Sequence, residues 1–279
     1  MNDVLLARIA QLRPLPQAVM ALQAVLQDEG ASVADCAARI RQDPALTARL
    51  LRLANSAFYG VPGRVAGIDD AVQLIGLRSL RLLAMTAAVT LQFQAPAGAA
   101  RWLDAFWRHA LAVAHLAQGL AERRGLPVER AYVAGLLHDI GRLVLRTAAP
   151  DVTTHAAFDG ADHAAVGAAV ARHWHLPEAV AEAVAVHHQP PAGGGAPTLV
   201  DVVHVADALA HGLGYGYDQR EHAPVIDAAA WQRLQGDTLD MDALGARVQR
   251  AVDDTCQALG VSRPNPEPRR EAQSEEPTP

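Results

Sequence analysis

A histidine and an aspartate stand side by side in the apolar stretch VAGLLHDIGRLVL, residues 133–145 of this 279-residue chain. Burying two ionisable groups there without partners costs several kcal/mol. A divalent cation offsets that cost, because it neutralises the carboxylate and takes up the lone pair of the imidazole. His138 and Asp139 are therefore the first candidates for a metal site.

Histidines are confined to the second part of the chain: all 12 lie between positions 109 and 222. Seven histidine and aspartate residues fall on successive expected helices, about 20 to 30 residues apart, which is the length of one helix out and one helix back. This spacing returns each group to the same end of an antiparallel bundle. The seven candidate metal ligands are His109, His138, Asp139, His163, His187, His188 and Asp207. The other histidines are expected to be structural or surface residues: His115, His155, His173, His175, His204, His211 and His222.

The chemistry that these residue types favour is binding of Fe, Mn, Zn or Ni, as one ion or as two ions bridged by an aspartate. Two such ions would support hydrolysis of a phosphomonoester or phosphodiester. The alternative is structural: Asp139 accepts backbone N–H groups at a helix end, Gly141 closes the turn, and each histidine is solvated or satisfied in the core. The structural alternative is preferred for any single histidine, whereas the order and spacing of all seven groups favour a present or ancestral metal site.

Arg142 directly follows the His-Asp-Ile-Gly turn and has two interpretations. Its guanidinium could contact a substrate phosphate at the metal site, or it could compensate the negative end of a helix. The sequence leaves both open.

Helical periodicity covers nearly the whole chain, and no stretch shows the alternation of a β-strand. Asp43-Pro44 is typical of an N-cap followed by the first helical residue. Leu46, Leu50 and Leu53 then form one apolar stripe. We therefore predict an all-α fold in which a helical N-terminal subdomain packs on a helical bundle that holds the histidines.

Four segments follow from composition. The stretch QAPAGAA, residues 94–100, is the expected boundary between an N-terminal helical part, residues 1–98, and a helical bundle, residues 99–214. Residues 215–261 are expected to add two short helices, around Trp231 and Val248, that pack back on the body. The end, residues 262–279, is rich in proline and charge and is predicted to be disordered.

The formal net charge is −6, and the 24 basic residues, all arginine, form no dense basic block, so no direct binding of nucleic acid is expected. Two cysteines far apart argue against a disulfide framework and against a zinc-thiolate site. The long uncharged span between Arg81 and Arg101 contains glutamine, proline and glycine, so it is interpreted as a buried helix and a loop. We expect a cytoplasmic protein with no membrane partner.

Several motifs carry a family resemblance. The segment GLLHDIG, with FWRHALAVA upstream and HAAVGAAVARHWHLPEAVAEAVAVHH downstream, resembles the HD superfamily of metal-dependent phosphohydrolases. In the first part, LRPLPQAVMALQAVL, IRQDPALTARLLRLANSAFYG and IDDAVQLIGLRSLRLLAM look like the HDOD family, the HD-related output domain of bacterial signalling proteins. The resemblance covers roughly residues 8 to 212.

The resemblance implies an all-helical protein whose N-terminal part is fused to an HD-like part and which works as a regulatory output module. Catalysis is generally not established for this family, but the seven candidate residues match the ligand positions of the superfamily. The Gly-Tyr-Pro signature of the related cyclic-di-GMP phosphodiesterases is missing after the paired histidines. Those enzymes support a third metal with a glutamate where this chain has Ala105, so two ions are the ceiling.

Three functions follow. The preferred one is a noncatalytic signalling module that binds a protein partner and retains a divalent-metal site. The second is a metal-dependent phosphohydrolase acting on a nucleotide or cyclic dinucleotide. The third is a receptor that holds a nucleotide without cleaving it. The complete set of candidate metal ligands supports the phosphohydrolase. Saturable binding of a nucleotide that is recovered uncleaved would identify the receptor. A regulatory role rests on analogy at the level of the fold.

Overall fold

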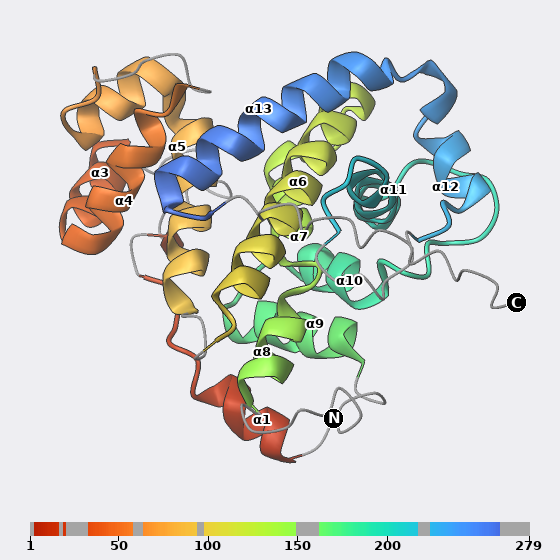
Figure 1. The fold of residues 1–279 in the computed structure, drawn as a ribbon, viewed down its shortest axis with the longest axis horizontal. Coiled ribbons are helices and arrows are strands. Elements are labelled where there is room, and N and C mark those ends of the chain that lie inside the picture. The colour runs from red at the N-terminus through yellow and green to blue at the C-terminus, as the bar shows by residue number, and fades with distance from the viewer. Residues whose placement is uncertain are drawn as a thin grey trace, which may run out of the picture.

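The structure is a computed structural model that describes residues 3–16, 19–20, 33–57, 64–93, 98–148, 162–216 and 224–262 (Figure 1). Within these ranges the regular structure is helical and contains no strand, so the predicted all-α class is confirmed. Residues 94–97 of the predicted boundary 94–100 and residues 263–279 of the predicted tail 262–279 lie outside the described residues. The helices are α1 (Asp3–Ala10), α3 (Val33–Arg41), α4 (Pro44–Ala54), α5 (Ile68–Gln92), α6 (Ala100–Arg124), α7 (Val128–Leu137), α8 (Ile140–Ala148), α9 (His163–His173), α10 (Glu178–Val186), α11 (Leu199–Gly212), α12 (Ala228–Arg233) and α13 (Met241–Leu259), with a 3₁₀ turn η3 (Gly236–Thr238).

Helix α4 begins where the sequence predicts. The Asp43 side chain accepts hydrogen bonds from the backbone N–H groups of Ala45 and Leu46, and Pro44 occupies the first turn. The three leucines of the predicted stripe are fully buried. Capping and an apolar face together therefore fix this helix.

Helix α5 contains the long uncharged span. It bends at Gly76, whose φ of +80° lies in the left-handed region that glycine adopts without a Cβ clash. By length and composition α5 could cross a membrane, and 56% of its apolar window is buried inside the protein. Its side chains from Leu82 to Thr90 are all buried, as expected for a core helix.

Helix α6 is the central element of the bundle. It packs against α7, α11 and α13, and Figure 1 shows it running through the middle of the molecule. An almost unbroken buried run extends from Phe106 to Ala117, so this helix is enclosed by protein for most of its length. That run contains His109, which places an imidazole at the centre of the fold.

The C-terminal part differs from the two short helices that the sequence suggests. Helix α12, around Trp231, is short, but α13 has 19 residues. Asp240 caps α13, whose amphipathic pattern continues to Gly260 in the left-handed conformation. This length lets α13 lie along α6 and reach α4, so it contacts both predicted parts of the chain (Figure 1).

One hydrophobic core continues through the described helices before and after residue 98. Phe93 lies between Trp107 and Trp174, with ring centroids 6.3 and 6.5 Å away. The Trp174 indole N–H also donates to the carbonyl oxygen of Arg13 at 3.1 Å. These aromatic contacts tie the N-terminal helices to the bundle.

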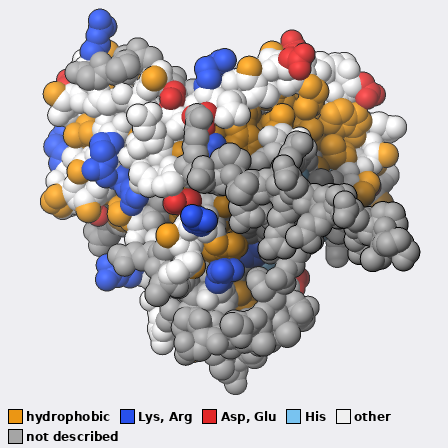
Figure 2. Space-filling view, viewed as in Figure 1, with side chains coloured by type: hydrophobic (Ala, Val, Ile, Leu, Met, Phe, Trp, Pro, Cys, Tyr) orange, Lys and Arg blue, Asp and Glu red, His pale blue; other side chains and the backbone are white. Residues whose placement is uncertain are grey.

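Arginine side chains are scattered over the face in Figure 2, among hydrophobic and uncharged groups. Two less exposed arginines make contacts between helices. Arg81 pairs with Glu129 at 2.6 Å across α5 and α7, and Arg108 pairs with Asp253 at 2.9 Å across α6 and α13. These arginines join helices to one another.

Candidate metal centre

The seven predicted ligands come from separate elements and meet inside the bundle. His109 lies on α6 and Asp207 on α11, whereas His138 and Asp139 occupy the turn between α7 and α8. His163 is the first residue of α9, and the paired histidines directly follow α10. Their ligand atoms gather in two adjacent groups, the buried cluster (His109, His138 and Asp207) and the open cluster (Asp139, His163, His187 and His188).

The buried cluster is closed to solvent. His109 Nε2 lies 3.1 Å from His138 Nε2 and 3.3 Å from Asp207 Oδ1. His138 Nε2 and Asp207 Oδ1 are 3.7 Å apart. Two imidazoles and a carboxylate therefore converge on one small volume in the core.

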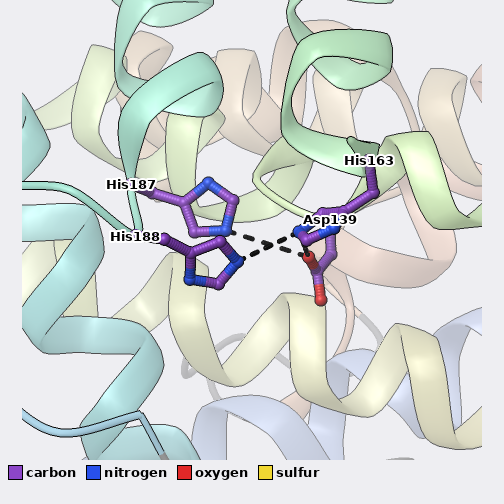
Figure 3. A group of neighbouring side chains, drawn as sticks. All are labelled: Asp139, His163, His187 and His188. Atoms are coloured by element: carbon purple, nitrogen blue, oxygen red, sulfur yellow. Dashed lines mark hydrogen bonds and ion pairs between the residues drawn. The ribbon is translucent and has the colours of Figure 1, made fainter. Parts of the chain in front are cut away.

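The side chains of the open cluster point toward one another in Figure 3, and His188 is the exposed member. His163 Nε2 is 3.1 Å from both Asp139 Oδ1 and His188 Nε2. His187 Nε2 faces the same carboxylate oxygen at 3.9 Å. Three imidazole nitrogens thus surround one carboxylate at the edge of the bundle.

Asp139 joins the two clusters. Its Oδ1 faces the histidines of the open cluster, and its Oδ2 lies 3.5 Å from His138 Nε2 in the buried cluster. A carboxylate with one oxygen toward each group has the arrangement expected of a bridge between two cations.

The ring orientations of two histidines fit metal binding. His138 Nδ1 lies 2.8 Å from the Gly135 carbonyl oxygen, and His187 Nδ1 lies 2.8 Å from the Val184 carbonyl oxygen. A carbonyl only accepts, so each Nδ1 carries the proton and each Nε2 keeps its lone pair. His187 Nε2 is buried and makes no hydrogen bond among the described residues. A buried lone pair directed at a carboxylate is the donor arrangement that suits a cation.

The charge states also suit a metal. Burial alone would raise the pKa of Asp139, but His138 and the hydrogen bond with His163 outweigh it. Together with Arg142 they hold that pKa well below the usual range, so the carboxylate is ionised at neutral pH. Burial and the neighbouring His138 lower the pKa of His187 to about 4. Partial desolvation at the rim, with His187 and His163 beside it, lowers the pKa of His188 to about 4 as well, so both rings are neutral. Neutral imidazole and ionised carboxylate are the forms that ligate metals.

Two glycines allow the helices to approach closely enough to form the site. A Cβ at Gly141 would overlap the His163 carbonyl oxygen and lie 2.8 Å from the Gly167 nitrogen. A Cβ at Gly135 would lie 2.9 Å from backbone atoms of α6. The first glycine therefore lets α8 and α9 bring Asp139 to His163, and the second lets α7 bring His138 to His109.

Arg142 lies against the bridging aspartate, with its Nε 3.1 Å from Asp139 Oδ1. Its side chain is 30% exposed, so it stands at the rim of the open cluster. Contact with this carboxylate is its role in the structure, and contact with a phosphate stays a prediction.

His211, predicted to be a structural or surface residue, belongs to the surroundings of the site. Its Nδ1 is 3.1 Å from Asp207 Oδ1, and its ring lies 4.7 Å from that of His109. Burial would raise the pKa of Asp207, but hydrogen bonds with His109 and His211 lower it well below the usual range. The signal was present, since residues four apart share one helix face.

An all-helical bundle with adjoining His/Asp clusters at the HDIG turn defines an HD-type protein. Residues 12–190 match the HDOD domain family, and the chain belongs to that family. A protein from Shewanella amazonensis SB2B, provisionally named a phosphohydrolase, has a similar structure: the TM-score is 0.68 at 27% identity, over 92% of this chain and 98% of that one.

Two curated relatives share parts of the sequence. An uncharacterised protein of Treponema pallidum (strain Nichols) is 30% identical over 202 residues, which cover 66% of this chain and 39% of that protein. Ribonuclease Y of Thermus thermophilus is 41% identical over 103 residues, 37% of this chain and 16% of the enzyme. This chain therefore aligns with less than half the length of either relative.

Proposed function

We propose that this protein is a bacterial HDOD signalling module that binds one or two divalent metal ions at the seven clustered residues and acts through a protein or nucleotide ligand. The observation that carries the metal site is the buried lone pair of His187 Nε2, held in place by the Nδ1 contact with Val184. We expect it to work in the cytoplasm with a signalling protein as partner.

The buried and open clusters would each hold one ion, with Asp139 between them. When bound, divalent ions supply Lewis-acid polarisation of a phosphoryl oxygen and lower the pKa of water. The mixed imidazole and carboxylate donors favour Fe, Mn, Zn or Ni over Mg or Ca. The protein's own part is to hold the ligands in the neutral imidazole and ionised carboxylate forms and to limit access to the side of His188.

A second candidate function is hydrolysis of a phosphoester in a nucleotide or cyclic dinucleotide. The completeness of both clusters favours it, as does the placement of Arg142 at the exposed rim, where a guanidinium could contact a phosphate. The structural relative from Shewanella carries a phosphohydrolase name, and Ribonuclease Y is named for cleaving RNA. The missing Gly-Tyr-Pro element argues against the cyclic-di-GMP phosphodiesterase type.

The first experiment is metal content per chain, measured by mass spectrometry on untagged protein purified without chelator. One to two equivalents would support the metal site and would justify incubating the protein with nucleotides and cyclic dinucleotides. Hydrolysis would favour the enzyme, and saturable binding without product would favour the receptor form of the module. Metal that is substoichiometric and is not restored by anaerobic addition of Fe, Mn, Zn or Ni would contradict the proposal.

A further inference from the structure

A segment beyond the family-matched residues 12–190 is connected to the open cluster through His204 and through the loop that follows the paired histidines. It consists of Asp227 and helix α12, and it packs on α11. Two buried polar residues, His204 and Arg233, form the contacts. We refer to Asp227–Arg233 as the C-terminal brace.

His204 connects the brace to the turn that carries a candidate ligand. The backbone N–H of Asp227 donates to His204 Nε2 at 3.0 Å. Because Nε2 accepts, the proton of this neutral ring is on Nδ1, which donates to the carbonyl oxygen of His187 at 2.9 Å. Both nitrogens of His204 are thereby committed to the backbone, one to each segment.

Arg233 holds the loop that follows the paired histidines. Its guanidinium pairs with Asp201, which is fully buried, and its Nε–Oδ2 distance is 3.0 Å. The same guanidinium donates to the carbonyl oxygens of Pro191, at 2.8 Å, and Gly193. Asp201 in turn accepts from the Thr198 backbone N–H at the start of α11. One side chain thus holds the middle of the connection between α10 and α11 against the first turn of α11.

We propose that the C-terminal brace controls metal affinity at the open cluster, with His204 and Arg233 as positioning residues for His187 and His188. The proposal rests on the metal site proposed above and adds a regulator of it. His109 and His138 of the buried cluster lie on α6 and at the end of α7, which take no part in these hydrogen bonds. Asp207 shares α11 with His204, but its carboxylate pairs with His109 and His211 and not with the brace. Coupling is reciprocal: a partner that displaces α12 weakens metal binding, and metal binding holds α12 in place.

The test is a Co²⁺ titration of the full chain after removal of metal, followed by visible absorption. His188→Ala and His109→Ala assign each binding event to the open or the buried cluster. There are two brace variants. His204→Phe keeps an aromatic ring in the core but removes the hydrogen bonds to Asp227 and His187. Arg233→Lys keeps a positive charge beside Asp201 but loses the guanidinium that binds the carbonyl oxygens of Pro191 and Gly193. The matched control is His115→Phe, because His115 is a buried histidine outside both clusters, 6% exposed against 5% for His204.

Both brace variants should weaken Co²⁺ at the open cluster by about tenfold or more, the cost typical of losing an outer partner of a ligand. The buried cluster should keep its affinity, and His115→Phe should bind like the unchanged protein. Hydrogen exchange of the unchanged protein gives a second measurement that needs no brace variant to fold. Co²⁺ should slow exchange of amides 227–233, and His188→Ala should abolish this protection.

Wild-type binding in folded brace variants, with exchange of amides 227–233 unaffected by Co²⁺, would overturn the regulation and leave the metal site standing. Equal weakening of both clusters would also overturn it, because that pattern reports a general loss of stability. A protein that binds no Co²⁺ at either cluster would refute the proposed metal function itself, and the regulation with it.

Discussion

The buried cluster and the open cluster use the same two side-chain types, yet they meet solvent differently. Core elements α6, α7 and α11 enclose His109, His138 and Asp207, all with side chains at most 5% exposed. The open cluster is assembled from turns and helix ends, and His188 reaches the surface. An ion in the buried cluster would exchange slowly and stabilise the fold, whereas an ion in the open cluster would be accessible to a ligand.

Asp139→Ala should have the largest effect, because this carboxylate faces both clusters. We expect loss of metal from both, and loss of the stabilisation that metal gives to the folded state, about 4 kcal/mol at a metal concentration of about 1,000 times Kd. Metal content and the thermal midpoint measure the two effects. The control is Asp162→Asn, beside His163, which should keep the metal content and the thermal midpoint of the unchanged protein. Unchanged metal content in Asp139→Ala would rule out a bridging role for this carboxylate.

Gly141→Ala should come next, because the added methyl group meets the backbone of α9. We expect destabilisation of about 3 kcal/mol from overpacking, and weaker metal binding at the open cluster, where α9 supplies His163. Urea unfolding of the metal-free protein measures the loss of stability. Gly212→Ala is the control, because open space surrounds that helical glycine. Equal stability of the two variants would show that α8 and α9 can separate without cost.

His188→Ala tests the difference between the clusters directly. Removing this exposed ligand should weaken only the open cluster, by more than about a hundredfold, and leave the stability of the metal-free protein nearly unchanged. His109→Ala should do the reverse: it should empty the buried cluster and lower stability, because it leaves a cavity in the core. Calorimetric titration with Mn²⁺ measures the affinity of each cluster, and urea unfolding measures the stability of each variant. If His188→Ala removed both ions, the clusters would be one site.

The last prediction concerns acid. Burial lowers the pKa of His115 and of His187 to about 4, against 6.5 for the unfolded chain. Above pH 6.5 neither state binds these protons. As the pH falls from 6.5 toward 4 only the unfolded state takes them up, so stability decreases by up to about 1.4 kcal/mol per pH unit for each group.

Urea unfolding of the metal-free protein at about pH 7 and about pH 5 measures this dependence. His115→Phe should reduce the slope, because it removes one of the buried histidines whose pKa is lowered and leaves His187 in place. A slope identical to that of the unchanged protein would show that His115 is protonated alike in both states.

The sequence was sufficient to predict the helical class and the meeting of the seven residues, because both follow from local signals. Asp43-Pro44 marks a helix start, and the HDIG turn places two ligands next to each other with a glycine that permits close packing. The spacing of the remaining ligands matches one helix out and one back.

The features that the sequence did not predict, the contact of His204 and the length of α13, depend on contacts between residues distant in the sequence. His204 accepts from the backbone of Asp227, an interaction that leaves no mark on residue types, so the sequence predicts a structural or surface residue there but not the segment that it contacts. The length of α13 was missed because its polar outer face resembles a loop, whereas its buried stripe becomes clear only against α6. Division into segments at residues 98 and 214 remains a prediction.

The backbone contact at Gly141 and Gly167 has an evolutionary consequence. The shape of the site is set by how closely two helices approach, and backbone atoms at two glycines, not the ligand side chains, limit that approach. A descendant could therefore lose its ligands one by one and keep the same helix packing at this end of the bundle. Selection on the glycines and selection on the histidines can thus be separated, and a lineage is free to keep the scaffold while it replaces the chemistry.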